Sequence, residues 1–464
     1  MTKKDDYWEK IFQHANFDDE RRRIRAMKIT KTIENSFERG ASAALPDHGS
    51  LKAASLFVNS ASVTPQKIVD PFIKENMESV TCDHVLIAED TTEMNFSWRT
   101  KKLEGLGPVG NNIDQGFFLH PGIIIDPCQE SVLGLAGINL MVRDEERDTT
   151  NYKSKPIEEK ESYRWLSLPE EARGKLPESI HMTVVADREG DIFDLFHLQY
   201  MGGMGKNSDL LVRACRDRKL EDEEDFFFKT VDKLPIKGHY ELKVNSTKTR
   251  TARRTRMEVR YDKITMKVPK THPKGKFKAV PNVYVIDVRE INPPDGEEAI
   301  HWTLLTTWKV DNLSNALEKV RWYSCRWFIE ELFRILKSGY KAEKVQFNTG
   351  HALMNWCALR LMMAVRLLGL LTQRDVETPD SALPYFSPEE IKILKYNEKK
   401  LISPRSKRYR PPKKSLAWAV LILAIMGGYK ATPSALPPGQ TCLWRGLDKL
   451  ESAVIGFLAA QEYL

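Results

Sequence analysis

The chain has 464 residues, 41% of them hydrophobic and 29% charged, and a formal net charge of +7. These values are typical of a soluble protein of two or three domains, and because the net charge is modest, where the bases lie matters more than their number. The six cysteines are scattered without a C-x-x-C pair, which argues against a zinc module or a disulfide framework and fits a reducing cytosol.

No segment is typical of export, of a membrane span or of a nucleotide site. The N-terminus lacks the apolar core of a signal peptide. The longest apolar run, 416–426, is far shorter than the roughly 20 residues of a span. The oily segment 353–371 contains Arg360 and Arg366 and predicts a buried core helix. The G-x-G-x-x-G match at 105–110 follows charged residues rather than an apolar strand, so we expect no nucleotide cofactor and no membrane partner.

Residues 1 to about 70 are predicted to be helical. Within them the basic run RRRIRAMKITK, at 21–31, follows the acidic DDE at 18–20. Acidic residues before basic ones suit the dipole of a helix that begins there. The run can be a solvated helix face or a surface that binds phosphates, and this pattern alone does not separate the two.

From about 80 to 210 the chain has short apolar runs that end in acidic residues, which predicts an α/β domain. HVLIAEDTT at 84–92 predicts a buried strand ending near Asp90, and SIHMTVVADREGD at 179–191 predicts one ending at Asp187. Further strands are predicted at 116–126, 131–142 and 210–218.

Asp90 and Asp187 are candidate site residues, because ligands bind at the carboxyl ends of strands in open α/β sheets. A carboxylate there costs free energy unless it is paired or bound to a metal. Each aspartate can instead be a local cap, Asp90 in an Asx-turn and Asp187 at the start of a helix. Glu189 and Asp191 are alternatives for the second acid.

Residues from about 225 to 310 alternate between apolar and polar positions and carry few helix signals, which predicts an all-β insertion. Its bases are dense, as in KTRTARRTR at 248–256. Arg253, Arg254 and Arg256 are therefore candidates for non-specific contacts with nucleic-acid phosphates.

The segment YSCRWFIEELFRILKSG, at 323–339, predicts an amphipathic helix with Gly339 as its C-cap. Arg334 lies at the edge of its polar stripe, and Glu331 lies about 100° from that stripe. Glu330 is therefore the candidate third acid, although a solvated charged face gives the same pattern. The polar stripe itself consists of Tyr323, Arg326, Glu330 and Lys337.

Two strand-end aspartates and one helix glutamate would form an oxygen-rich pocket, which suits Mg²⁺ or Mn²⁺ rather than zinc. Two such ions about 3.5–4 Å apart would activate a water or hydroxyl in phosphoryl transfer. Beyond this helix, residues 375–414 predict a polar connection, and residues 415–464 predict an apolar helical pair.

Several motifs together resemble the DDE transposases of the insertion-sequence-four class nearly from end to end. IAEDTT and VVADREGDI resemble the segments of the first two acids, and Y-x-x-R-W-x-I-E-E with a later Lys resembles the Tyr-Arg-Glu-Lys signature. EINPPDGE before HWTLLT resembles the end of the β insertion, and GFLAAQEYL resembles the C-terminal dimerisation helix. The stretch from about 35 to 80 is only loosely similar, so recognition of a particular DNA end does not carry over.

The resemblance implies an α/β fold, with an RNase H-like catalytic core, an inserted all-β subdomain, and helical N-terminal and C-terminal regions. The implied boundaries are 1–70 for DNA binding, 71–375 for the catalytic domain with its insertion at about 225–310, and 376–464 for dimerisation.

The resemblance also implies roles for individual residues. Asp90, Asp187 and Glu330 would be catalytic and would hold two Mg²⁺ ions, for which Mn²⁺ would substitute. Trp302 and Trp327 would stack near a flipped base, although Trp302 can also be a core strand aromatic. The implied DNA contacts are Tyr323, Arg326, Lys337, Arg334 and Arg213 at phosphates near the cut, and Arg21, Arg22 and Arg25 at the transposon end.

The implied activity is cut-and-paste transposition by a homodimer on double-stranded DNA. Hydrolysis frees a 3′-OH, a DNA hairpin forms and reopens, and the 3′-OH joins target DNA. We expect a cytoplasmic, bacterial protein that associates with the nucleoid when bound to DNA. Two alternatives stay open: a catalytically inactive DNA-binding regulator, and an RNase H-like nuclease without strand transfer.

Overall fold

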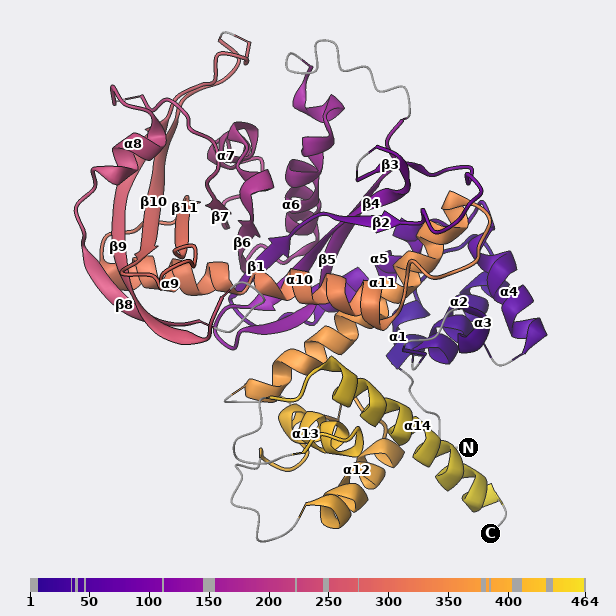
Figure 1. Cartoon of the computed structure of the whole chain (residues 1–464). Coiled ribbons are helices and arrows are strands. Elements are labelled where there is room, and N and C mark those ends of the chain that lie inside the picture. Colours follow the sequence, from indigo (N-terminus) through magenta and orange to yellow (C-terminus); the bar gives the residue numbers. More distant parts are fainter. Residues whose placement is uncertain are drawn as a thin grey trace.

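The computed structural model describes residues 7–34, 36–37, 41–45, 47–110, 112–144, 155–221, 223–244, 250–273, 275–376, 381–383, 385–402, 411–430 and 437–462. A wide mixed sheet forms the body of the molecule (Figure 1). A group of N-terminal helices lies beside this body, and the C-terminal helices lie below it in the same view.

Five strands form the centre of the sheet, in the order β5-β4-β1-β6-β7. β4 is antiparallel to β1 and β5, whereas β1, β6 and β7 are mutually parallel. This arrangement is an RNase H-like core, as the sequence resemblance implied. The bounds are β1 His84–Glu89, β4 Asp114–Asp126, β5 Ser131–Met141, β6 His181–Ala186 and β7 Ser208–Arg213.

The insertion extends the same sheet instead of forming a separate one. Its last strand, β11, pairs antiparallel with β7, and β10, β9 and β8 follow outward. At the opposite edge, β2 and β3 pair with β4. The bounds are β8 Gly238–Val244, β9 Arg253–Met266, β10 Val280–Glu290, β11 His301–Thr306, β2 Thr92–Asn95 and β3 Gly107–Val109, with a short helix, α8 Phe227–Asp232, before β8.

Helices cover both faces of the central strands, which explains why β1 and β6 are continuous apolar runs with five successive buried residues each. On one face α6 approaches so closely that a Cβ at Gly122 would lie 2.6 Å from Leu168 Cδ2. On the other face α5 and α11 pack together against β5. The bounds are α5 Pro65–Glu78, α6 Arg164–Lys175, α7 Phe193–Tyr200 and α11 Gly350–Thr372.

The N-terminal region is helical, as predicted, and hydrogen bonds connect it to α11. Asp19 accepts a hydrogen bond from the Arg21 amide (2.8 Å), which caps the helix that begins at the basic run. Buried Asn355 of α11 donates to the carbonyls of Val58 (2.9 Å) and Val63 (3.0 Å). The bounds are α1 Tyr7–Phe12, α2 Glu20–Ile33, α3 Ala41–Ala44 and α4 His48–Val58.

The segment predicted as one helix over 323–339 is instead part of a longer, irregular rod. Helix α9 (Leu313–Ser324) tightens at Arg326, whose amide donates to the Tyr323 carbonyl (3.0 Å), and α10 (Trp327–Arg334) then begins. The last turn, Ile335–Gly339, is π-helical, and the Tyr340 amide donates to the Ile335 carbonyl (2.8 Å). The residues after Arg334 therefore leave the regular 100° spacing on which the predicted stripe depended.

Gly339 ends this rod, but it is not the predicted left-handed C-cap. Tyr340 is the capping residue, with φ −82°. The position favours glycine for a packing reason, because a Cβ there would lie 2.3 Å from the Phe37 ring.

The C-terminal region contains the predicted pair α13 (Leu416–Met426) and α14 (Gln440–Glu462). It also contains α12 (Pro388–Leu401), within the stretch predicted as a polar connection. Ser387 and Glu390 form a capping box at the start of α12. This S-x-x-E signal was present in the sequence.

Helix α11 is the one helix, among the described residues, that is long and apolar enough to cross a bilayer by length and composition. However, 83% of its most apolar window is buried within the fold. It packs as a core helix, as Arg360 and Arg366 predicted.

Candidate active site

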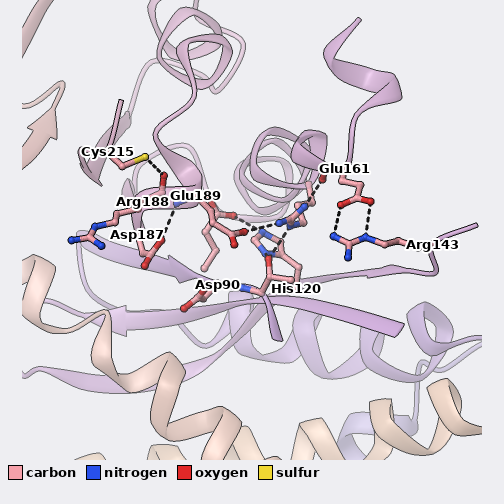
Figure 2. Close-up of polar contacts among 11 residues, drawn as sticks. Asp90, His120, Arg143, Glu161, Asp187, Arg188, Glu189 and Cys215 are labelled. Atoms are coloured by element: carbon pink, nitrogen blue, oxygen red, sulfur yellow. Dashed lines mark hydrogen bonds and ion pairs between the residues drawn. The ribbon is translucent and has the colours of Figure 1, made fainter. Parts of the chain in front are cut away.

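The two strand-end aspartates lie side by side. β1 and β6 run parallel, and their last residues, Glu89 and Ala186, are direct partners in the register. Asp90 and Asp187 follow these two residues, so both leave the sheet at the same edge (Figure 2). The juxtaposition follows from strand pairing, which the sequence did not specify.

Of the two aspartates, Asp187 makes the local cap that was considered as an alternative, because its Oδ1 accepts from the Glu189 amide (2.9 Å) at the start of a short 3-10 helix, Arg188–Gly190. Asp90 Oδ1 accepts from the adjacent Thr91 amide (2.7 Å), which is one residue too near for an Asx-turn. These bonds engage one oxygen of each carboxylate and fix its orientation. The local cap and a role in the site are therefore compatible.

Arg326 joins the third acid to the first. Its Nη1 donates to Asp90 Oδ2 at 3.0 Å, and its Nη2 pairs with Glu330. Glu331 instead pairs with Arg334. The structure thus brings Glu330, rather than Glu331, toward the strand-end aspartates.

The carboxyl of Asp90 is buried and within electrostatic reach of the other two acids. Burial raises its pKa to about 6, and the charges of Asp187 and Glu330 add to the increase, while Arg326 and the Thr91 amide oppose it. The ionised form of Asp90 is therefore disfavoured even with an arginine beside it. A divalent cation would relieve the same cost.

The donor set fits a hard divalent cation, since it consists of carboxylate oxygens on three different elements. In the parts of the chain that the structure describes, no three His, Cys, Asp or Glu side chains are close enough to share an ion. The guanidinium of Arg326 lies between Asp90 and Glu330. An ion held by both carboxylates would require this guanidinium to move.

Tyr323, Arg213 and Trp302 form an aromatic and basic wall beside the acids. The ring of Trp302, on β11, meets that of Tyr323 edge-on at 5.7 Å. Arg213, at the end of β7, donates to the carbonyl of His301 (3.1 Å). Burial raises the pKa of Tyr323, opposed by Arg326 and Arg213 and increased by Asp187, so the phenol lies among these groups.

Arg334 and Trp327 lie on another face of α10. Together with Arg321, Arg374 and Glu331 they line a hollow of about 810 Å³ whose walls include neither Arg326 nor Glu330. The Trp327 side chain is 61% exposed. Arg334 therefore faces this hollow and does not extend the polar stripe of Glu330.

Lys337 faces a different acidic residue, Glu343. It is in the π-helical turn, and its Nζ is 3.8 Å from Glu343 Oε1. Glu343 in turn accepts from the amide of Asn95, at the end of β2. Lys337 thus links the π-helical turn to the end of β2 through Glu343.

The three N-terminal arginines differ in their surroundings. Arg21 pairs with Asp19 (2.9 Å) and is 88% exposed, whereas Arg22 donates to the Phe17 carbonyl (3.0 Å). Arg25 lines a hollow of about 340 Å³ between α2 and α4, together with Arg21 and Lys28. The basic side of α2 is thus open to a phosphate backbone.

The basic residues of the insertion are likewise not equivalent. Arg253 bonds to Glu290 (2.8 Å) and Glu297 (2.5 Å), so its charge is used within the fold. Arg254 and Arg256 are exposed. Of the three predicted phosphate contacts, these two remain accessible.

Sequence reasoning missed the buried polar groups behind the site. Fully buried Glu89 lies 3.3 Å from His120 Nε2, and Arg164 bonds to Thr91 (2.8 Å). Burial raises the pKa of Glu89 and lowers that of His120. The apolar residues around Glu89 and His120 in the sequence could have indicated that these two side chains are buried. Their partners could not be predicted, because they lie far away along the chain.

The two alternatives for the second acid are engaged elsewhere. Asp191 is fully buried and bonds to the amides of Cys215 and Arg216, each at 2.8 Å, and to the Arg218 side chain. Glu189 pairs with Arg164 at 2.8 Å. Asp187 is thus the acid of this loop that faces Asp90 across the sheet edge.

Comparisons with known proteins match two parts of the chain. Residues 203–366 match the family model of the transposase DDE domain, a span that runs from before β7 into α11 and includes Glu330 but neither Asp90 nor Asp187. Residues 4–63 match the model of a transposase DNA-binding region, which covers α1–α4 and the basic run.

Among solved structures, the chain is similar to a piggyBac transposase synaptic complex with hairpin DNA. The two share 10% sequence identity, with 90% of this chain and 82% of that chain covered, at a TM-score of 0.37. This similarity is too low to assign a shared mechanism. A DDE domain implies a divalent metal in general. Two parts of the chain therefore match transposase models, residues 4–63 a DNA-binding region and residues 203–366 a DDE domain.

Proposed function

We propose that the protein is a cut-and-paste transposase of the insertion-sequence-four class, most like the transposase of transposon five, with Asp90, Asp187 and Glu330 as its catalytic acids. The observation that carries the proposal is the pairing of Glu89 with Ala186, which sets two aspartates at one sheet edge. The link from Asp90 through Arg326 to Glu330 supports the third acid.

In this proposal the three carboxylates hold two Mg²⁺ ions, or Mn²⁺ in their place. When bound, such ions supply a more acidic water and neutralise charge at the leaving oxygen. Arg326 then donates to a phosphate oxygen instead of to Asp90 and Glu330, since a guanidinium fork matches phosphate as well as carboxylate. Tyr323 and Arg213 lie beside it and would orient the same phosphate.

The DNA steps follow the resemblance. Water attacks the phosphorus at the transposon end and frees a 3′-OH, and that hydroxyl attacks the opposite strand to close a hairpin. Trp302 supports this route, because an indole beside Tyr323 can stack on a base that leaves the tight hairpin. After the hairpin reopens, the 3′-OH attacks target DNA. Trp327 and Arg334, on another face of α10, and Lys337, in the π-helical turn, would contact DNA further from the cut.

The proposed partners are two transposon ends and target DNA, bound by a homodimer in the bacterial cytoplasm at the nucleoid. The open basic side of α2 supports contact with the transposon end. The end of α14 supports a dimer, because Ile455 (62% exposed) and Leu458 (42% exposed) leave apolar surface on it uncovered.

Strand transfer tests this proposal against both alternatives. Purified protein is incubated with pre-cleaved transposon ends, supercoiled plasmid and Mg²⁺, and the joined products are mapped. The proposal expects paired-end insertions by the wild type and none by Asp187→Asn. Cleavage without joining would favour a nuclease, and binding without cleavage would favour an inactive regulator.

Mixing two inactive variants tests whether the protein acts as a homodimer. Asp187→Asn lacks a catalytic acid but keeps the basic surface of α2, whereas Arg25→Glu disrupts that surface but keeps all three catalytic acids. If two chains act together and one chain cuts the end held by the other, the two defective variants mixed together would recover part of the activity. No recovery at any ratio would contradict cutting in trans.

A further inference from the structure

The guanidinium of Arg164, the first residue of α6, joins the two loops that carry the proposed catalytic aspartates. Its Nε donates to Thr91 Oγ1 (2.8 Å), and its Nη2 donates to Glu189 Oε2 (2.8 Å). Its Nη1 donates to the Glu161 carbonyl (2.6 Å), in the turn just before α6. All three nitrogens are engaged, and the side chain is only 15% exposed.

The two residues that Arg164 holds are the same two that orient the aspartates. The Thr91 amide donates to Asp90, and the Glu189 amide donates to Asp187. Arg164 is therefore one residue removed from each carboxylate. In Figure 2, Asp90 and Asp187 lie at neighbouring strand ends, with Glu189 beside Asp187 in the chain and His120 behind Asp90.

A chain of polar contacts anchors this arrangement in the core. Arginine can only donate, so the Thr91 hydroxyl accepts from Arg164, and the same hydroxyl lies 2.9 Å from His120 Nδ1. His120 Nε2 in turn lies 3.3 Å from the Glu89 carboxyl. The Thr91 hydroxyl is thus held between two side chains, which fixes the start of the Asp90 loop.

We propose that Arg164 is a positioning residue that sets the spacing and orientation of Asp90 and Asp187 for a divalent cation. This inference rests on the proposed function of the two aspartates. The planar fork of an arginine reaches both loops at once, whereas a lysine, as a single point of charge, cannot replace both bonds in the same geometry. Residues that hold metal ligands in place commonly affect metal affinity by roughly ten- to hundredfold.

The same helix supplies a matched control. Arg173 of α6 also makes several bonds, donating to the carbonyls of Leu176 (3.0 Å) and Ile180 (2.8 Å). These bonds hold the chain before β6, at the opposite end of that strand from Asp187. Arg173→Met therefore removes a structural arginine of α6 without touching either aspartate loop.

The test measures Mn²⁺ binding to the full chain by electron paramagnetic resonance, together with the rate and the KM for DNA in end cleavage. We expect Arg164→Met to bind Mn²⁺ roughly ten- to hundredfold more weakly, to lower kcat, and to leave the KM for DNA unchanged. Arg164→Lys should restore the affinity only in part. Arg173→Met should lower thermal stability but keep the Mn²⁺ affinity of the wild type.

Variants of Thr91 test the same inference without changing Arg164. They decide it even if Arg164→Met fails to fold. Thr91→Val has the same shape without the hydroxyl and should weaken Mn²⁺ binding, whereas Thr91→Ser keeps the hydroxyl and should bind as the wild type does. Unchanged Mn²⁺ affinity in both Arg164→Met and Thr91→Val, or an equal loss in Arg173→Met, would overturn the inference. A wild type that neither binds Mn²⁺ nor cuts DNA would overturn the proposed function first.

Discussion

Replacing Asp90 by asparagine should stabilise the protein in the absence of divalent metal while abolishing its activity. The pKa of Asp90 rises from 3.8 to about 6, mainly because the carboxyl is buried. The folded value lies above the unfolded one, so the protonated form favours folding below pH 3.8, and this advantage disappears as the pH rises through about 6.

The magnitude follows from the size of that shift. About two pKa units correspond to roughly 3 kcal/mol at pH 7 and above, which is the cost of keeping the ionised carboxylate in the fold. Asparagine has almost the same shape and can still accept from Thr91 and Arg326, so it would remove most of this cost. Allowing for imperfect replacement of the ion pair, we expect a gain of about 1–3 kcal/mol.

Thermal unfolding with EDTA, followed between pH 5 and pH 8, measures the effect. The Tm of Asp90→Asn should exceed that of the wild type at pH 8, and the difference should shrink toward pH 5. Asp287→Asn is a control of opposite sign. Burial alone would raise the pKa of Asp287, but its hydrogen bonds to His301 and Thr303 lower this pKa overall. Asp287→Asn should therefore be less stable than the wild type. A Tm for Asp90→Asn that is lower than the wild type, or a difference that does not change with pH, would refute the reasoning.

Three further predictions follow from the same contacts. Mg²⁺ should raise the Tm of the wild type by several degrees more than that of Asp90→Asn, measured in one titration, and equal shifts would place the ion elsewhere. Trp302→Ala should slow hairpin formation by tenfold or more while leaving the first nick in place, since base–aromatic stacking contributes about 1–3 kcal/mol; equal loss of both bands on a sequencing gel would contradict this. Burial and the charges of His181 and Lys319 lower the pKa of His84 from 6.5 to about 4. The free energy of unfolding should therefore decrease as the pH drops from 6.5 to about 4. In thermal melts over this pH range, the Tm of His84→Gln should decrease less than that of the wild type.

The elements that carry the candidate site, β1, β6 and α10, could be predicted from the sequence. Apolar runs ending in acids located β1 and β6, and helical spacing separated Glu330 from Glu331. These are local signals, because side-chain period and strand composition depend on neighbouring residues. Such signals can therefore be recognised without knowledge of the tertiary structure.

The details that complete the site depend on contacts between distant segments. Arg164 bonds to a residue 73 positions away, and Arg326 bonds to one 236 positions away. Nothing local distinguishes Arg164 from Arg173, the other arginine of α6. The tight turn at Arg326 and the π-helical turn at Lys337 also have no local sequence signal, so the predicted stripe was regular where the rod is not.

The measurement that tests the account most directly is cleavage of a labelled duplex carrying the element's own ends, with Mg²⁺ and with EDTA, by the wild type, Glu330→Ala and Glu331→Ala. The account predicts metal-dependent nicks and hairpins from the wild type and from Glu331→Ala, and none from Glu330→Ala. Equal cleavage by Glu330→Ala, or cleavage in EDTA, would contradict the assignment of Asp90, Asp187 and Glu330 as the catalytic acids.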